Sequence, residues 1–257
     1  MSIYQHFPQS EHAFLDKILE WQADVEQNYA PKLTNFLDPR EQDVIQSVVG
    51  KNADIKMKLS GGRDGYERKR ALLHPDYYEP MDEDFQLAFF ELRYPEKFVT
   101  IEHRDLLGAL MSSGLKREKF GDIIFAEERI QFVLAEEVSD YVELQLESVG
   151  KAKVHVFSIG KEQLIEVKDE WAELNKTVSS LRLDAVLSEA YSLSRAKVIA
   201  LIEKGYVHVN WKTIEQPSYQ VHEGDFLSIR GFGRSKLLEI VGKSKKDRWR
   251  LRLGRKK

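Results

Sequence analysis

Residues 179–237 read SSLRLDAVLSEAYSLSRAKVIALIEKGYVHVNWKTIEQPSYQVHEGDFLSIRGFGRSKL and carry the most specific pattern in the 257-residue sequence. Polar residues precede two helix-forming stretches, a glycine ends the second stretch, and alternating residues then predict strands. The segment is therefore predicted to form two helices followed by a small sheet. Its landmarks, in order, are Arg182-Leu183-Asp184, Ser194-Arg195, Gly205, Val207 to Asn210, Gly224-Asp225 and Ile229-Arg230-Gly231.

This ordered set of landmarks resembles the S4 RNA-binding domain. The resemblance implies that residues 179–257 form a small α+β domain that binds structured RNA. The sequence departs from the family pattern at the turn after the first strand, where S4 domains usually carry Asn-Gly but Asn210 is followed here by Trp211. This departure weakens the expectation of the usual tight turn, which requires positive φ angles.

Charge divides the chain in the way expected of a nucleic-acid-binding protein. Residues 179–257 contain 17 Lys and Arg against 8 Asp and Glu, a net charge of +9, whereas residues 1–178 contain 22 against 34, a net charge of −12. The overall charge of −3 conceals this division. A basic segment attached to an acidic body favours RNA as the partner of the basic part.

Composition excludes several classes of site. The chain has no cysteine, which removes disulfides, thiolate nucleophiles and cysteine-based zinc sites. The seven histidines lack metal-ligand spacing, and we expect neither a metal nor a small-molecule cofactor. No secretion signal or membrane-length apolar run is present, so a cytoplasmic protein without membrane contact is expected.

The fold class is predicted as α+β with three small domains. Residues 1–80 read as helices and a β-hairpin whose tip contains Gly61-Gly62, and residues 81–165 as a ferredoxin-like, RRM-like βαββαβ domain. Residues 166–178 are interpreted as a connection into the S4-like domain, residues 179–257. Asp38-Pro39 is predicted to start a helix, because Asp caps and Pro suits the first turn.

The central domain is not expected to bind RNA as an RRM does. An RRM stacks bases on aromatic side chains of its sheet, whereas the third strand here offers only Phe132. Residues 81–165 also contain 10 Lys and Arg against 17 Asp and Glu. We therefore expect its sheet to pack against another part of the chain.

The predicted RNA contacts gather around the two helix starts of the S4-like domain. Ser179 or Ser180 and Ser194 are expected to cap these helices, which exposes backbone N–H groups that attract phosphate. Cations in a first turn oppose the helix dipole, so those at these two starts indicate an anion site unless they pair with Asp184 or Glu189. The predicted contacts are Arg182, Arg195, Lys197, Lys204, Trp211, Lys212, Arg230, Arg234 and Lys236.

Two of these assignments have simpler alternatives. Lys204 suits the C-terminal end of a helix dipole, and Trp211 either stacks on an unpaired base or folds back onto the domain. The alternation from Arg248 to Arg252 is read as an edge strand with a basic or charge-protected face. Without a carboxylate partner for Arg195, its replacement by Ala should leave the helix at least as stable.

The body of the chain adds a second resemblance. Four motifs, starting at Gly61, Tyr66, His103 and Leu115, resemble the YlmH family of Gram-positive bacteria: GGR, YERKRA, HRDLLGAL and LKREKFGDI. The resemblance then covers nearly the whole chain. It implies a protein encoded near cell-division genes, associated with the large ribosomal subunit, that helps to rescue stalled peptidyl-tRNA and binds ribosomal RNA or tRNA.

The sequence thus favours a non-enzymatic RNA-binding factor with no catalytic residue, and two alternatives stay open. One is an RNA-modifying enzyme with a site in residues 1–165, using Asp105 or Asp122; a buried carboxylate of raised pKa in a cleft would favour it. The other is a division-site adaptor whose acidic body binds a protein partner. A second candidate RNA contact lies on the hairpin: Arg63, Arg68, Lys69 and Arg70.

Overall fold

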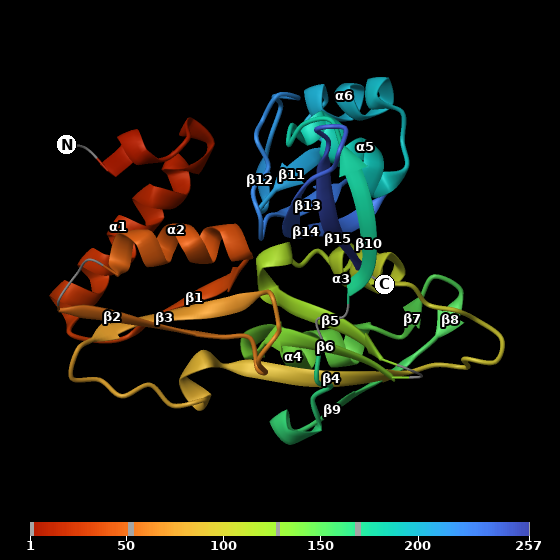
Figure 1. The fold of residues 1–257 in the computed structure, drawn as a ribbon. Helices are drawn as coiled ribbons and strands as arrows, with labels where there is room; N and C mark the ends of the chain where they lie inside the picture. Colours follow the sequence, from red (N-terminus) through yellow and green to blue (C-terminus); the bar gives the residue numbers. More distant parts are fainter. Residues whose placement is uncertain (1–2, 51–53, 127–128, 168–170, 257) are drawn as a thin grey trace. The chain divides into compact units, whose positions relative to one another are not determined.

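The computed structural model describes residues 3–50, 54–126, 129–167 and 171–256. The chain separates into two compact units, Met1–Lys168 and Asp169–Lys257, each with its own sheets and helices (Figure 1). This mixture of helices and several small sheets confirms the predicted α+β class. Within the described residues, no helix combines the length and apolar character that crossing a membrane requires.

The first unit begins with two helices packed on a three-stranded sheet of order β1-β3-β2. As predicted, Asp38 caps the second helix and forms a reciprocal capping box with Glu41. The first strand was not predicted, because a register shift between Leu33 and Phe36 breaks its alternating pattern. These elements are α1 (His12–Asn28), β1 (Lys32–Leu37), α2 (Pro39–Val49), β2 (Ile55–Ser60) and β3 (Lys69–Pro75).

The strands β2 and β3 form the predicted antiparallel hairpin. Its Gly61-Gly62 pair is required by close packing of the tip. A Cβ atom on Gly61 would lie 2.5 Å from the carbonyl oxygen of Arg68, and one on Gly62 would lie 2.6 Å from the ring of Phe89. Gly62 also has a φ of +101°, which side chains rarely tolerate. The two glycines therefore let the tip rest on the central sheet.

The central part has a four-stranded sheet of order β5-β6-β4-β9, with antiparallel neighbours throughout. This order is the ferredoxin-like arrangement that the sequence predicted. A short β7-β8 hairpin precedes the last strand. The elements are β4 (Leu87–Arg93), α3 (His103–Ser112), β5 (Phe120–Ala126), β6 (Arg129–Ala135), α4 (Ser139–Gln145), β7 (Ser148–Val149), β8 (Ala152–Lys153) and β9 (His155–Ser158).

Both faces of this sheet are covered. Phe132 is fully buried and its ring stacks on Phe90 at 5.6 Å, within the core that also contains α3 and α4 side chains. The other face contacts the N-terminal part of the unit. There Gly121 leaves room for Phe36 of β1, because a Cβ atom on Gly121 would lie 2.8 Å from the Phe36 ring. As expected, the sheet packs against another part of the chain and has no exposed aromatic ring at Phe132 for a base.

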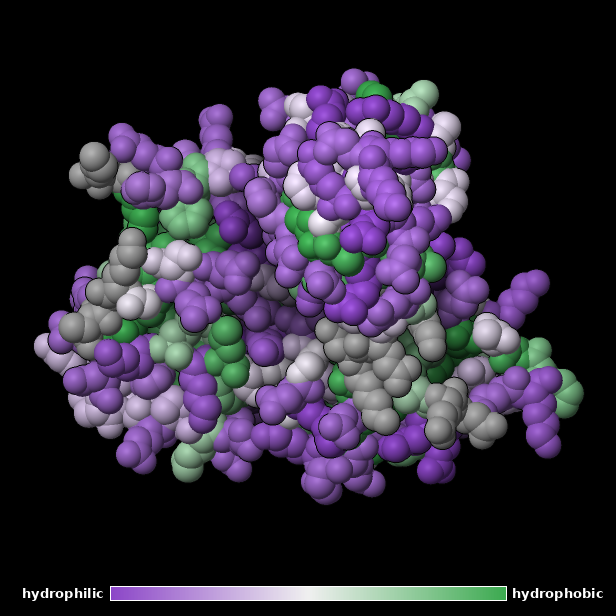
Figure 2. Space-filling model, viewed as in Figure 1, coloured by the Kyte–Doolittle hydropathy of each residue, from purple (hydrophilic) through white to green (hydrophobic). Residues whose placement is uncertain are grey.

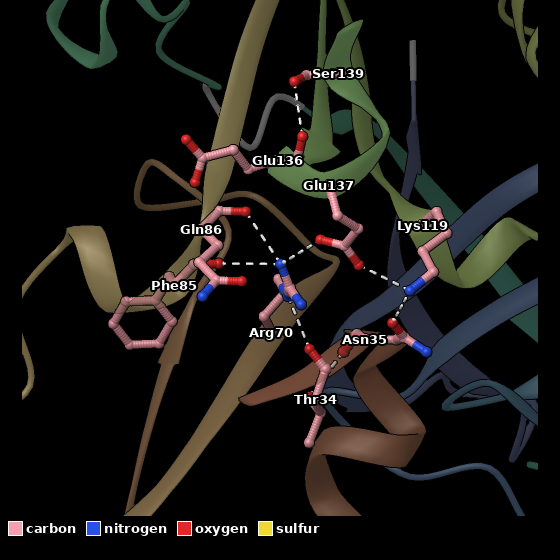
Figure 3. Close-up of polar contacts among 9 residues, drawn as sticks. All are labelled: Thr34, Asn35, Arg70, Phe85, Gln86, Lys119, Glu136, Glu137 and Ser139. Carbon is pink, nitrogen blue, oxygen red and sulfur yellow. Dashed lines mark hydrogen bonds and ion pairs between the residues drawn. The ribbon is translucent and has the colours of Figure 1, made fainter. Parts of the chain in front are cut away.

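Arg70 joins the N-terminal part to the central part (Figure 3). Its guanidinium donates to the carbonyl oxygens of Thr34 at 2.7 Å and Gln86 at 3.0 Å, and lies 3.5 Å from the Glu137 carboxylate. Lys119 donates to the same carboxylate at 2.8 Å and to the Asn35 side chain at 2.7 Å. The predicted boundary between residues 80 and 81 therefore falls inside one compact unit.

The second unit has a six-stranded sheet of order β10-β15-β14-β13-β11-β12, with a core shared by its strands and two helices. Residues 171–178 of the segment predicted as a connection form the strand β10, which pairs with β15 over eight positions. Its side chains are mostly half-buried or exposed, so the apolar alternation of a strand is missing. The elements are β10 (Trp171–Val178), α5 (Leu183–Tyr191), α6 (Arg195–Glu203), β11 (Val207–Val209), β12 (Lys212–Thr213), β13 (Phe226–Ile229), β14 (Gly233–Lys243) and β15 (Trp249–Lys256).

Candidate RNA-binding surface

One buried carboxylate holds two of the predicted RNA-binding arginines. Asp184 is 1% exposed and accepts hydrogen bonds from Arg182 at 3.1 and 3.2 Å and from Arg195 at 2.9 and 3.0 Å. Its Oδ1 atom, which accepts from Arg182, also accepts from the backbone N–H of Ala185. Asp184, from the start of α5, thus brings together cations that precede α5 and open α6.

The electrostatics of this cluster favour the ionised carboxylate. Burial by itself raises the pKa of Asp184, but the hydrogen bonds from Arg182 and Arg195 outweigh burial and hold the pKa below its ordinary value. The side chains of Arg182 and Arg195 remain 39% and 49% exposed. Because two cations share one anion, the cluster keeps a net positive charge beside both helix starts.

Two details of the predicted helix starts need correction. Arg182 is the N-cap of α5 and not a residue of its first turn, and neither Ser179 nor Ser180 is the cap. The alternative that the arginines have a carboxylate partner is the one observed, and the partner is Asp184. Ser194 does cap α6, accepting from the N–H of Lys197, so Arg195 and Lys197 lie in its first turn as predicted.

Three other predicted contacts lie over aromatic rings. The Lys197 ammonium lies 5.2 Å from the centre of the Phe232 ring, the Arg230 guanidinium 5.6 Å from that of Tyr206, and the Lys236 ammonium 4.3 Å from that of Phe226. Cation–π contacts of this kind restrict long side chains. The cations are therefore partly positioned on the surface before any ligand arrives.

The turn between β11 and β12 is tight even though it lacks glycine. Asn210 and Trp211 have φ angles of 49° and 61°, and Val209 pairs with Lys212, as in a two-residue type I′ hairpin. The Asn210 side chain donates to Asp225 at 2.8 Å and accepts from the N–H of Phe226 at 2.9 Å. These bonds hold the turn against β13, a role for Asn210 and Asp225 that the sequence did not reveal.

Trp211 is partly exposed and its ring lies 5.1 Å from that of Phe226. The ring thus packs back on the sheet while one part of it stays accessible. Lys212, beside it, is exposed. The turn therefore presents an aromatic surface next to a cation.

The remaining predicted contacts are exposed, and one strand assignment was wrong. Lys204 follows the last turn of α6, and Arg234 lies on β14. The strand that includes Arg250 and Arg252 is no edge, because β15 lies between β10 and β14. Arg252 also pairs with Glu239 at 2.8 Å. Hydrophilic side chains dominate the face of this unit seen in Figure 2.

The second candidate contact, on the hairpin of the first unit, is largely used by the fold. Arg70 is 4% exposed, and burial lowers its pKa. The Glu137 carboxylate raises this pKa but offsets only part of the effect of burial. Arg68 donates to the carbonyl oxygens of Phe120 at 3.1 Å and Phe36 at 3.0 Å. We therefore leave Arg68 and Arg70 out of any RNA surface, whereas Arg63 and Lys69 remain partly exposed.

The two candidate catalytic carboxylates have local structural partners. Burial raises the pKa of Asp122, as the enzyme alternative required, but its oxygens accept from the backbone N–H groups of Glu67 and Arg68. Asp105 accepts from the N–H of Glu102 in the capping box of α3. Among the described residues, no group of three or more acidic or histidine side chains is arranged to hold a metal ion.

Comparison with known proteins matches this architecture in three segments. Residues 10–78 match the N-terminal part of YlmH, residues 80–163 a putative RNA-binding domain in YlmH, and residues 181–227 the S4 domain. Ribosome-associated protein quality control protein P2 of Bacillus subtilis (strain 168) is 49% identical over 261 residues, covering 99% of both chains. The cell division protein YlmH from Streptococcus pneumoniae, a solved structure, is 32% identical with a TM-score of 0.55 and covers 64% of this chain and all of its own.

Proposed function

Because the chain belongs to the YlmH family of S4-domain RNA-binding proteins, we propose that it is a non-enzymatic factor that binds structured ribosomal RNA or tRNA on the ribosome. The name of the Bacillus relative supports an action in ribosome-associated quality control. Peptidyl-tRNA that remains bound to the large subunit after stalling is the RNA ligand that best suits such a role. The protein would work in the cytoplasm, with the large subunit as its partner.

The observation that carries this proposal is the paired helix start held by Asp184. The side chains of Arg182 and Arg195 meet at Asp184 and remain partly exposed, and Lys197 lies with Arg195 in the first turn of α6. Phosphate groups spaced along an RNA backbone fit several such donors at once. Because the donors contact phosphates and not base edges, the surface is expected to read the shape of the RNA more than its sequence.

The name of the Streptococcus relative supports a link to cell division. We propose that this link follows from the role on the ribosome rather than from a separate catalytic activity. The partners of Asp105 and Asp122 support the absence of a reaction at those carboxylates.

Salt dependence of RNA binding tests the proposal on the full-length chain. Lys197→Gln is expected to reduce the slope of log affinity against log salt by about 0.7–0.9, the loss of one phosphate contact. Lys17→Gln, which removes an exposed cation from α1, is the matched control and should leave the slope unchanged. Equal slopes for the parent chain and both variants, measured on ribosomal RNA and on tRNA, would reject the proposed surface.

A further inference from the structure

The hairpin tip of the first unit borders a pocket of about 330 Å³ that collects cations from distant parts of the sequence. Lys58 lies on β2, Arg63 in the tip, Lys69 at the start of β3, and Lys161 in the segment after β9. Asp64 and Asp82 also line the pocket. Four cations against two carboxylates make a positive site in a part of the chain that is otherwise strongly acidic.

The cations differ in how much the fold uses them. Arg63 donates to the carbonyl oxygen of Leu164 at 2.6 Å, and Lys58 to that of Pro80 at 3.2 Å. Lys161 pairs with the carboxylate of Asp82. The ammonium group of Lys69 has no hydrogen-bond or ion-pair partner among the residues that the structure describes, whereas its backbone pairs with Leu37. Lys69 is therefore available to a ligand without breaking any contact of the fold.

The Asp82 carboxylate shows what chemistry the pocket accepts. The hydrogen bond from Lys161 leads the effects that lower the pKa of Asp82, and the nearby charges of Lys161 and Lys58 act in the same direction. The ammonium groups thus already favour an oxyanion at this place. A phosphate group offers the same type of oxygen with more charge, and Lys and Arg are its usual protein partners.

A second pocket of about 300 Å³ adjoins the first and shares Gly62, Asp82 and Lys161 with it. Phe89 and Gln86 line this pocket, together with the carboxylates of Asp82, Glu83 and Glu136, which can accept hydrogen bonds from the amino group of a base. An aromatic ring and an amide are groups that recognise a nucleobase by stacking and by hydrogen bonding. A cationic pocket joined to an aromatic one matches the two ends of a nucleotide.

We propose that the hairpin-tip pocket binds the phosphate of a nucleotide, with its base in the adjoining pocket against Phe89. The site lies wholly in the first unit and does not depend on RNA binding by the S4 unit. The phosphate belongs either to an RNA chain or to a free nucleotide. Arg63 and Lys69 belong to the second RNA contact that the sequence suggested, and in this proposal Lys58 and Lys161 join them.

Nuclear magnetic resonance titration of the ¹⁵N-labelled full-length protein tests this site with three probes: inorganic phosphate, AMP and the RNA tetranucleotide AAAA. AMP should shift the amide signals of residues 61–64 and of Phe89, and should bind more tightly than inorganic phosphate. Lys69→Gln and Lys58→Gln should each weaken AMP binding about fivefold, a typical effect of losing one exposed charge contact. Lys17→Gln is the control with an equal change of charge.

The probes separate the two sources of the phosphate. Tighter binding of the tetranucleotide than of AMP identifies RNA, and the reverse order identifies a free nucleotide; either result supports the pocket. The proposal is overturned if none of the probes shifts these signals. It is also overturned if Lys69→Gln and Lys58→Gln, folded as judged by their spectra, bind AMP as the Lys17→Gln control does.

Discussion

Asp184 is 1% exposed and is shared by Arg182 and Arg195, so removal of either arginine leaves a buried anion with fewer donors. Arg195 also lies in the first turn of α6, where its charge opposes the helix dipole by about 0.3–1 kcal/mol. A hydrogen bond to a buried charge contributes about 1.5–3 kcal/mol. The bond to Asp184 therefore outweighs the dipole effect, and Arg195 serves the fold as well as the proposed RNA surface.

We accordingly expect Arg195→Ala to lower the free energy of unfolding by about 1 kcal/mol, because the carboxylate contact outweighs the relieved dipole. Urea denaturation of the parent chain and the variant measures this difference. Lys197→Ala removes a neighbouring cation that contacts the Phe232 ring and, within the described part of the chain, no carboxylate, so it should change the stability much less. An Arg195→Ala protein as stable as its parent would show that Asp184 finds sufficient donors without Arg195.

The lowered pKa of Asp184 predicts a dependence of stability on pH. A carboxylate with a lower pKa in the folded than in the unfolded state stabilises the fold above its unfolded pKa of about 3.9, and this contribution disappears as pH falls through the folded pKa. The difference in unfolding free energy between the parent chain and Asp184→Asn should therefore shrink below about pH 4. Asp247→Asn, at an exposed carboxylate, is the control.

At the scale of the elements, the tight β11–β12 turn holds Trp211 in a backbone conformation that costs non-glycine residues about 1–2 kcal/mol. Contact with the Phe226 ring returns about 0.5–1.5 kcal/mol. The two terms nearly cancel. Trp211 therefore adds little to the stability of the folded state. Its partly exposed ring is instead a candidate for contact with RNA.

Trp211→Gly should therefore leave the melting temperature nearly unchanged, while affinity for RNA with unpaired bases falls by about 1–3 kcal/mol if a base stacks there. Trp211→Phe keeps a ring at the same position and is the matched control. Filter binding with a stem-loop RNA and with its fully paired counterpart measures the effect. Unchanged affinity of Trp211→Gly for the stem-loop would assign the ring to packing on Phe226 alone.

Elements with strong local signals could be predicted from the sequence. The Asp38-Pro39 start of α2, the glycines of the hairpin and the alternation in the central strands depend on near neighbours in the chain. By contrast, β1 contains a register shift and β10 has few buried side chains, so neither shows the pattern of a strand. Their pairing is decided by distant residues, which periodicity does not reveal.

The same division applies to the candidate sites. The basic charge and the helix starts were visible in the sequence, because they depend on composition and on local caps. The sequence offered Asp184 only as an alternative partner and did not show that both arginines share it. The internal role of Arg70 and the meeting of Lys161 with the hairpin tip likewise depend on residues that are far apart. The sequence alone does not distinguish a lysine or arginine on the surface from one that is bonded within the fold. Only the structure identifies their partners.

At the scale of the whole molecule, the chain divides into an acidic and a basic compact unit. We expect a fragment of residues 169–257 to bind structured RNA and a fragment of residues 1–168 to bind it much more weakly at moderate salt. A fragment that begins at residue 179 should be less stable, because it lacks β10 and exposes the long strand β15. Filter binding and thermal melting of the three fragments test this, and equal affinity of the two larger ones would contradict it.

The pairing of β10 with β15 also sets an order for events during protein synthesis. Trp171 is opposite Lys256, so the sheet of the basic unit can close only after some 85 further residues have been translated. The first unit, Met1–Lys168, is compact by itself, so we expect it to fold while translation continues. Protease protection of ribosome-bound nascent chains of increasing length would reveal the two stages. The sheet of the basic unit therefore closes later in synthesis than the first unit folds.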